Sequence, residues 1–233
     1  MKPILKMLAQ VVICGVAVTL AGCGGGDDPH VLRLSGVAAT GLAIDGGTVD
    51  VQCVSGTGTA TTLANGSYSV TISGGTGPCL VTVTKDSVVL HSIAPKSSTG
   101  TAIANVTPIS DAIVQALVAA KGAVLVTDLV TSASAIPSNT DLSTVVTAVI
   151  EQVNAALALL TPPLPPLDLG TDLLGQANYV AATNLSPDSG DALDKALDAL
   201  VAAGSGSLPG SLTTAITETV NSNVAPNPTG SVN

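Results

Sequence analysis

The sequence predicts an α+β chain in two parts, an N-terminal antiparallel β-sandwich followed by a C-terminal all-α helical domain. From residue 31 to residue 106, apolar and polar residues alternate with the period of two that is typical of half-buried strands. From Thr107 onward, apolar residues instead recur every three or four positions, as they do on one face of a helix. We therefore expect a β-sandwich domain over residues 31–106 and a helical domain over residues 107–224.

The first 22 residues have the features of an export signal. Lys2 and Lys6 precede the apolar run 7–20, which is too short for a membrane-spanning helix and is followed by small residues. The sequence Leu20-Ala21-Gly22-Cys23 resembles the bacterial lipobox at all four positions. This resemblance implies cleavage before Cys23 and attachment of diacylglycerol and further fatty acid, such as palmitate, to that residue. The alternative is an ordinary secretory signal that happens to precede a cysteine.

A short tether should follow the lipidated residue. Residues 23–30 are rich in glycine and aspartate, and we expect this stretch to be flexible. Gly24 occupies the position where, in enteric bacteria, an aspartate often retains a lipoprotein at the inner membrane. Its identity favours the outer membrane, with the protein facing either the periplasm or the exterior.

Three segments show the strand alternation most clearly, and each is bounded by residues that favour turns. The inward-facing sets are Val49, Val51 and Cys53; Tyr68, Val70 and Ile72; and Cys79, Val81 and Val83. The turn pairs are Gly46-Gly47, Asn65-Gly66, Gly74-Gly75 and Lys85-Asp86. Strands at this spacing, with no intervening helical pattern, favour a small antiparallel sandwich over a parallel α/β sheet.

Two of the four cysteines remain for the folded body. Cys14 should be removed with the signal peptide, and Cys23 should carry the lipid. Cys53 and Cys79 each share the phase of the valines on their own strand, so both should point into the core. In an exported protein we expect them to form one disulfide; two buried free thiols are the alternative.

The strand region also resembles a known family. The residues that carry this resemblance are Ser35-Gly36-Val37, the stretch Gly41 to Gly47, Thr48-Val49-Asp50-Val51, Thr61-Thr62 and Asn65-Gly66-Ser67-Tyr68-Ser69-Val70. They look like the carboxypeptidase regulatory-like domain, which implies a transthyretin-like β-sandwich. The chain departs from that pattern at Ile44, where proline is typical, at Asn65, where aspartate is common, and in its cysteine pair. With the stretch through Thr107-Pro108, it also resembles uncharacterised lipoproteins of Gram-negative bacteria, which implies no particular activity.

Several helices are expected in the second part. Thr107 is suited to an N-cap, Pro108 to the first helical position and Gly122 to a C-cap. The clearest helix covers residues 141–160, and the proline-rich stretch 161–166 should end it. Further helices are expected at 171–182, 189–203 and 211–222, followed by a disordered tail at 225–233.

Composition excludes several partners. Removal of residues 1–22 leaves five basic and sixteen acidic residues, a formal charge of −11. Five scattered cations cannot form the positive face that nucleic acid or an anionic membrane surface requires. Trp and Phe are missing and Tyr68 and Tyr179 are the only tyrosines, which argues against carbohydrate and single-strand binding, because both rely on exposed aromatic rings.

We find no catalytic or metal-binding constellation in the sequence, and no cofactor is implied. His30 lies in the tether, and His91 is expected to be a strand histidine with a hydrogen-bond partner; a catalytic base is the alternative. No Gly-x-Ser-x-Gly motif accompanies it. The acidic set Asp188, Asp191, Asp194 and Asp198 is interpreted as a solvated face, because its spacing follows one side of a helix and negative charge is favoured at a helix N-terminus. Calcium binding is the alternative, and the missing EF-hand spacing argues against it.

These observations predict a lipid-anchored bacterial envelope protein that acts as a structural or protein-interaction module without catalysis. Its membrane contact would be the lipid on Cys23, and its protein partner is unknown. The alternative is a binding protein for a small apolar or lipid ligand, held in a cavity lined by residues such as Val149, Leu157, Leu197 and Ile216. A third possibility is an enzyme that uses aspartate and serine without histidine.

Overall fold

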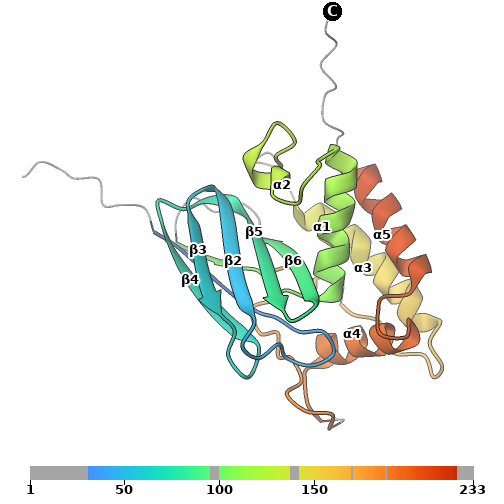
Figure 1. The fold of residues 1–233 in the computed structure, drawn as a ribbon. Helices are drawn as coiled ribbons and strands as arrows, with labels where there is room; N and C mark the ends of the chain where they lie inside the picture. The colour runs from blue at the N-terminus through green and yellow to red at the C-terminus, as the bar shows by residue number, and fades with distance from the viewer. Residues whose placement is uncertain (1–30, 95–99, 137–141, 169, 187, 225–233) are drawn as a thin grey trace, which may run out of the picture.

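The protein is described here from a computed structural model that combines two β-sheets with five helices (Figure 1). The structure describes residues 31–94, 100–136, 142–168, 170–186 and 188–224. The sheets occupy one side of the molecule and most of the helices the other. The expected signal peptide, Cys23, the tether with His30 and the tail 225–233 lie outside the described residues.

Seven strands form the two sheets. They are β1 (Val31–Val37), β2 (Thr48–Ser55), β3 (Thr57–Thr61), β4 (Ser67–Ser73), β5 (Thr76–Lys85), β6 (Val88–Ala94) and β7 (Gly100–Ile103). The four-stranded sheet has the order β3-β2-β5-β6 and is antiparallel throughout. The three-stranded sheet has the order β4-β1-β7. The three alternating segments predicted from the sequence lie in β2, β4 and β5, with their apolar residues buried as expected.

One strand pair departs from the antiparallel expectation. β1 and β4 pair antiparallel, but β1 and β7 pair parallel, with Leu32 opposite Gly100 and Ser35 opposite Ile103. A parallel pair needs a long crossover connection. Here the connection consists of β2 to β6, of which only β4 belongs to the same sheet, so no helix is required between β1 and β7. The short strand β7 offered too little alternation for its direction to be predicted.

Side chains from both sheets contribute to a single buried cluster. Its members come from β1, β2, β4, β5, β6 and the residues after β7, and include Leu32, Leu34, Val49, Val51, Tyr68, Val70, Ile72, Val81 and Val83. Tyr68 lies opposite Gly36 in the β1–β4 register, and its hydroxyl donates a hydrogen bond to the carbonyl of Ala104. A side chain at position 36 would collide with that carbonyl, which explains why glycine is required there.

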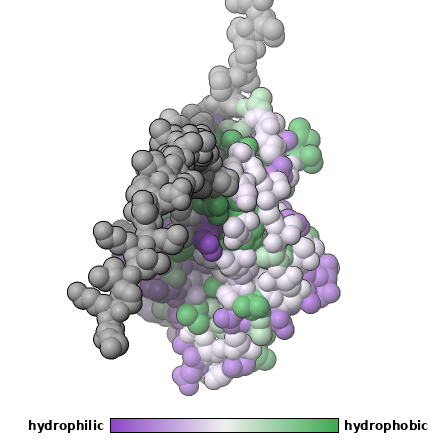
Figure 2. All heavy atoms as spheres, turned by 90° about the vertical axis from the view of Figure 1, so that its left-hand side faces the viewer, coloured by the Kyte–Doolittle hydropathy of each residue, from purple (hydrophilic) through white to green (hydrophobic). Residues whose placement is uncertain are grey.

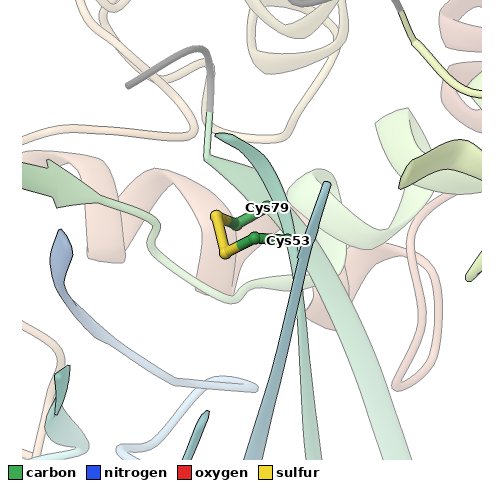
Figure 3. The surroundings of a disulfide bond; sticks show 2 residues. All are labelled: Cys53 and Cys79. Carbon is green, nitrogen blue, oxygen red and sulfur yellow. A yellow bond between two sulfur atoms is a disulfide. The ribbon is translucent and has the colours of Figure 1, made fainter. Parts of the chain in front are cut away.

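Cys53 and Cys79 form the predicted disulfide (Figure 3). The two residues face each other in the β2–β5 register and are at most 3% exposed. They belong to the same buried cluster as the valines on their strands. The inference from strand phase is therefore confirmed.

The helices are α1 (Pro108–Lys121), α2 (Asp128–Thr131), α3 (Leu142–Ala158), α4 (Ala192–Ala203) and α5 (Gly210–Asn223). The predicted caps of α1 are confirmed: the side chain of Thr107 accepts a hydrogen bond from the N–H of Ser110, and Gly122 adopts the left-handed conformation. α3 ends before the proline-rich stretch, as expected. The short helix α2 was not predicted, since four residues are too few to establish a period.

The expected helix at 171–182 is wrong. This segment has no helix or strand and runs irregularly beside the residues that follow β7. Its polar groups are used in local and tertiary hydrogen bonds instead: the side chain of Asp172 accepts from the N–H of Leu174, and the carbonyl of Leu174 accepts from the N–H of Asn105. We call residues 171–182 the strap, because they connect the sheet region to the helices.

Asn105 is the residue through which the strap is held. It is buried, and its side-chain Oδ1 accepts a hydrogen bond from the N–H of Val37 while its Nδ2 donates to the carbonyl of Gln176. One side chain thereby joins β1 to the strap. At the other end of the strap, the N–H of Ala43 donates to the carbonyl of Ala182.

The helices and the four-stranded sheet share a second, larger core. Leu80 of β5 and Ile93 of β6 are fully or almost fully buried, and they belong to the cluster formed by α1, α3, α4, α5 and the strap. α1 lies directly against β6 (Figure 1). The strand region and the helical region thus share the four-stranded sheet, which has apolar residues on both faces.

We predict that replacing both cysteines with alanine, as Cys53→Ala/Cys79→Ala, lowers the free energy of unfolding by about 3 kcal/mol. The disulfide closes a loop over a sequence separation of 26 residues and so restricts the unfolded chain. Urea unfolding followed by circular dichroism measures the difference. A reductant should bring the wild type to the stability of the double variant and leave the variant unchanged. Alkylation of both cysteines in the unreduced protein would contradict the disulfide.

We predict that Asn105→Ala lowers the free energy of unfolding by about 3 kcal/mol, because it leaves the N–H of Val37 and the carbonyl of Gln176 without their partner in a buried setting. Asn184→Ala, at an exposed asparagine, is the matched control and should change stability by less than about 1 kcal/mol. Equal effects in the same urea titration would show that Asn105 does not hold the strap.

Candidate functional site

β6 is an edge strand, and the first turn of α1 covers part of its open edge. Within β6, the backbone of His91 points away from β5: its N–H donates to Oδ1 of Asp111 at 3.1 Å, and its carbonyl accepts from Oγ of Ser110 at 2.8 Å. Two side chains of α1 therefore replace the missing neighbouring strand. Exposed strand edges invite uncontrolled pairing, and this arrangement closes the edge at His91.

The ring of His91 is part of the same joint. Its Nδ1 lies 2.6 Å from Oδ1 of Asp111 and 3.5 Å from Nε2 of Gln115. The expectation of a strand histidine with a hydrogen-bond partner is thus confirmed. The hydroxyl of Ser110 points at backbone carbonyls of His91 and Thr107 and not at the imidazole. Histidine, aspartate and serine meet here, but in an arrangement that fastens β6 to α1.

A surface groove of about 540 Å³ lies beside this joint, and we call it the β6 groove. One wall is β6, the second is α1, and the third is the segment between α4 and α5. Its lining is mainly apolar, with a few polar groups: Thr40, Val88, Leu90, Pro108, Asp111, Ala112, Gln115, Val201, Gly206, Ser207, Leu208 and Thr213. This volume lies in the range of ligand-binding clefts.

The open edge of β6 continues past His91 toward the β6 groove. In the antiparallel register, Thr82 pairs with His91 and Thr84 with Val89, so both β6 residues occupy positions of the same type. Because the backbone of His91 points outward, the N–H and carbonyl of Val89 point outward as well. Among the described residues, none is found to bond to these outward groups, and Val89 is 48% exposed.

The acidic set on α4 is not the solvated face that was expected. Asp194 is only 1% exposed, and its carboxylate accepts hydrogen bonds from the Tyr179 hydroxyl at 2.8 Å and the Ala182 N–H at 2.9 Å. Asp191 caps the helix and also accepts from the N–H of Val180. Only Asp188 is exposed as predicted. The carboxylates of α4 therefore hold the end of the strap.

One feature of the sequence indicates that Asp194 is buried. Asp194 follows Leu193 and lies three positions before Leu197, so it falls at the border of the apolar face of α4. An acidic residue in that position needs a buried donor, since an unpaired buried charge is costly. The strap supplies the donors through Tyr179 and Ala182, but this pairing could not be read from sequence spacing.

Asp198 forms one wall of a second, smaller pocket of about 230 Å³. Its Oδ1 is buried and has no hydrogen-bond partner among the described residues. Burial, and secondarily the charge of Asp194, raises the pKa of the Asp198 carboxyl from 3.8 to about 6. Burial also raises the pKa of Asp194, against the opposing effect of its hydrogen bonds, and raises the pKa of Tyr179.

The outer side of the sheets presents a different surface. A hollow of about 380 Å³ over β2, β3 and β5 is lined by four threonines together with Asp50, Val51, Gln52, Gly58 and Leu80. Figure 2 looks onto the molecule from the side of β3 and β4, and this face is mostly pale, with small separate hydrophilic and hydrophobic spots. Where grey atoms do not cover it, this face shows neither a large hydrophilic patch nor a large hydrophobic one (Figure 2).

The residues proposed to line an internal ligand cavity lie elsewhere than in these pockets. Val149, Leu157, Leu197 and Ile216 all belong to the buried helical cluster and are at most 4% exposed. Within the described residues, no three His, Cys, Asp or Glu side chains are grouped so that they could hold a metal ion. In the same part of the chain, no helix has the length and apolar character needed to cross a bilayer.

Comparison with protein-family models, with curated proteins and with solved structures finds no match to this chain.

We predict that Asp198→Asn weakens the pH dependence of stability. Because its pKa is raised in the folded state to about 6, folding favours the protonated carboxyl. Its stabilising contribution is complete below about pH 4 and is lost as the pH rises through about 6. At pH 7.5 the variant should be more stable than the wild type by about 1 kcal/mol, since partial exposure screens the charge. Urea unfolding between pH 4 and pH 8 measures this effect.

The control for that measurement is Asp198→Glu, which keeps a titratable carboxyl at the position. Its stability should still decline across the same pH range. Parallel profiles for the wild type and Asp198→Asn would show that this carboxyl titrates alike in the folded and unfolded chains.

Proposed function

We propose that this chain is a lipid-anchored bacterial envelope protein that acts as a structural or protein-interaction module and performs no catalysis. The observation that carries the interaction role is the β6 groove, where an apolar cleft runs beside an open strand edge. Clefts and edges of this kind accept segments of other proteins.

The anchor is proposed from the sequence Leu20-Ala21-Gly22-Cys23 and the charged and apolar segments before it. One acyl chain holds a protein only marginally at a bilayer, whereas two or more chains hold it stably. A multiply acylated Cys23 would keep the folded body at the outer membrane. The residues between Cys23 and β1 would then act as the tether.

The two sheets are proposed to form a β-sandwich of the transthyretin-like type. The buried cluster with members from both sheets supports this interpretation. The close approach of Gly36 to Tyr68 and Ala104 gives a physical reason for two of the residues that carry the family resemblance. Such sandwiches serve as spacers and docking units, although the fold alone does not determine function.

The non-catalytic role is supported by how the polar groups are used. His91, Asp111 and Ser110 hold β6 to α1, and Asp194 holds the strap through Tyr179 and Ala182. Each of these groups has a structural partner. To take part in a reaction, such a side chain would have to give up its structural partner and bind a substrate instead.

We predict that Cys23→Ala abolishes incorporation of labelled palmitate and cleavage before residue 23. The expected product is unprocessed precursor, because lipoprotein cleavage depends on the modified cysteine. Fractionation of the envelope and mass spectrometry of the N-terminus measure both effects. Cys14→Ala is the matched control and should be processed normally. Normal cleavage of Cys23→Ala would refute the anchor.

A further inference from the structure

We infer that the β6 groove binds an extended peptide segment of a partner protein, in which apolar side chains alternate with a lysine or arginine. This inference rests on the proposed interaction role and assigns it a site and a class of partner. Three features of the groove carry it: an open backbone edge, an apolar lining and one acidic group.

The backbone edge favours an extended partner. The outward N–H and carbonyl of Val89 are the groups that a neighbouring strand would use, since the next outward residue, His91, is already bonded to α1. A partner strand can therefore pair at Val89 and must then leave the sheet plane. The joint at His91 limits how far the partner strand can pair with β6.

The lining favours apolar side chains on that segment. The apolar lining includes Val88 and Leu90 of β6, Pro108 and Ala112 of α1, and Leu208. In an extended segment, alternate side chains point to the same side. Those that face the groove would bury apolar surface against these residues, which is how strand addition combines backbone pairing with side-chain specificity.

The charge favours a cation on the same segment. Of the described residues that line the groove, Asp111 alone carries a charge. Its Oδ1 accepts from His91, and the carboxylate remains at the groove wall. A lysine or arginine placed beside it would gain a partly buried ion pair.

The same charge argues against a second copy of this chain as the occupant. Edge-to-edge pairing through β6 would bring the Asp111 side chains of two copies toward each other. It would also join two bodies that each have a formal charge of −11 after residue 22. A cationic partner segment avoids this repulsion.

The test is photo-cross-linking in intact envelopes, with benzoylphenylalanine introduced into the full-length protein at Thr213, which lines the groove and is exposed. The matched position is Thr214, the next residue on α5, which is exposed and outside the groove lining. A third position, Thr59 on β3, samples the outer sheet surface. We expect a cross-link from Thr213 to a partner protein, and mass spectrometry should locate it in a segment of alternating apolar residues with a lysine or arginine.

Two pairs of variants test the mechanism of binding. Val89→Pro removes the outward N–H without removing a β5–β6 hydrogen bond, and it should reduce the Thr213 cross-link by about ten-fold. Val89→Ala keeps the N–H and should retain most of the cross-link. Gln115→Lys places a cation one helical turn from Asp111 and should reduce the cross-link by a similar factor, whereas Gln115→Glu should not. The Gln115 pair lies on an exposed helix position, so it tests the inference even if Val89→Pro fails to fold.

The remaining outcomes separate the inference from the proposed function. A protein cross-linked from Thr59 or Thr214 but not from Thr213 would leave the interaction role standing and overturn the assigned site. A Thr213 cross-link to a second copy, to lipid or to a segment without a cation would overturn the assigned partner. The absence of protein cross-links from all three positions would overturn both.

Discussion

The architecture depends on a four-stranded sheet that is apolar on both faces at β5 and β6. On one face Val81 and Val83 pack in the cluster between the sheets, and on the other Leu80 and Ile93 pack beneath the helices. Exposing either face of β5 and β6 would therefore place aliphatic surface in water, which is unfavourable. The helices are therefore needed by the strands as much as the strands by the helices. Because the chain has two tyrosines and no Phe or Trp, this mutual burial depends almost entirely on aliphatic side chains.

Polar groups fix how the two parts meet. Three buried or half-buried joints connect them: Asn105 with the strap, Asp194 with Tyr179 and Ala182, and His91 with Asp111 and Ser110. The energy of aliphatic packing changes little when the two parts rotate slightly against each other, whereas a hydrogen bond requires a defined distance and angle. Buried polar networks can in this way select one arrangement among several of similar hydrophobic burial. Two of the joints involve irregular backbone, at Asn105 and at Ala182, whose donors and acceptors must be satisfied.

The parts of this fold that follow from local sequence were predictable, and the parts that follow from contacts between distant residues were not. Alternation placed β2, β4 and β5 and the orientation of Cys53 and Cys79, and capping residues placed both ends of α1. The strap was mistaken for a helix because its leucines and alanines have helical spacing, yet its backbone is bonded to Asn105 and Ala43. The burial of Asp194 depends in the same way on Tyr179, fifteen positions earlier in the chain. The groove depends on three elements at once, so no single segment indicates it.

The closed and open parts of the β6 edge explain how such a protein can both resist aggregation and retain a docking site. A fully open edge on an aliphatic protein would pair with its neighbours, above all at the high local density that the proposed lipid anchor would produce. The side chains of Asp111 and Ser110 occupy the edge at His91, and the net negative charge keeps copies apart. What remains open is the short stretch at Val89, beside an apolar groove with one carboxylate. An edge of that length gives too few hydrogen bonds to bind a strand by backbone pairing alone, so side-chain fit and charge must supply the rest. Selectivity therefore resides in the groove, while the edge only sets the direction in which a partner segment can lie.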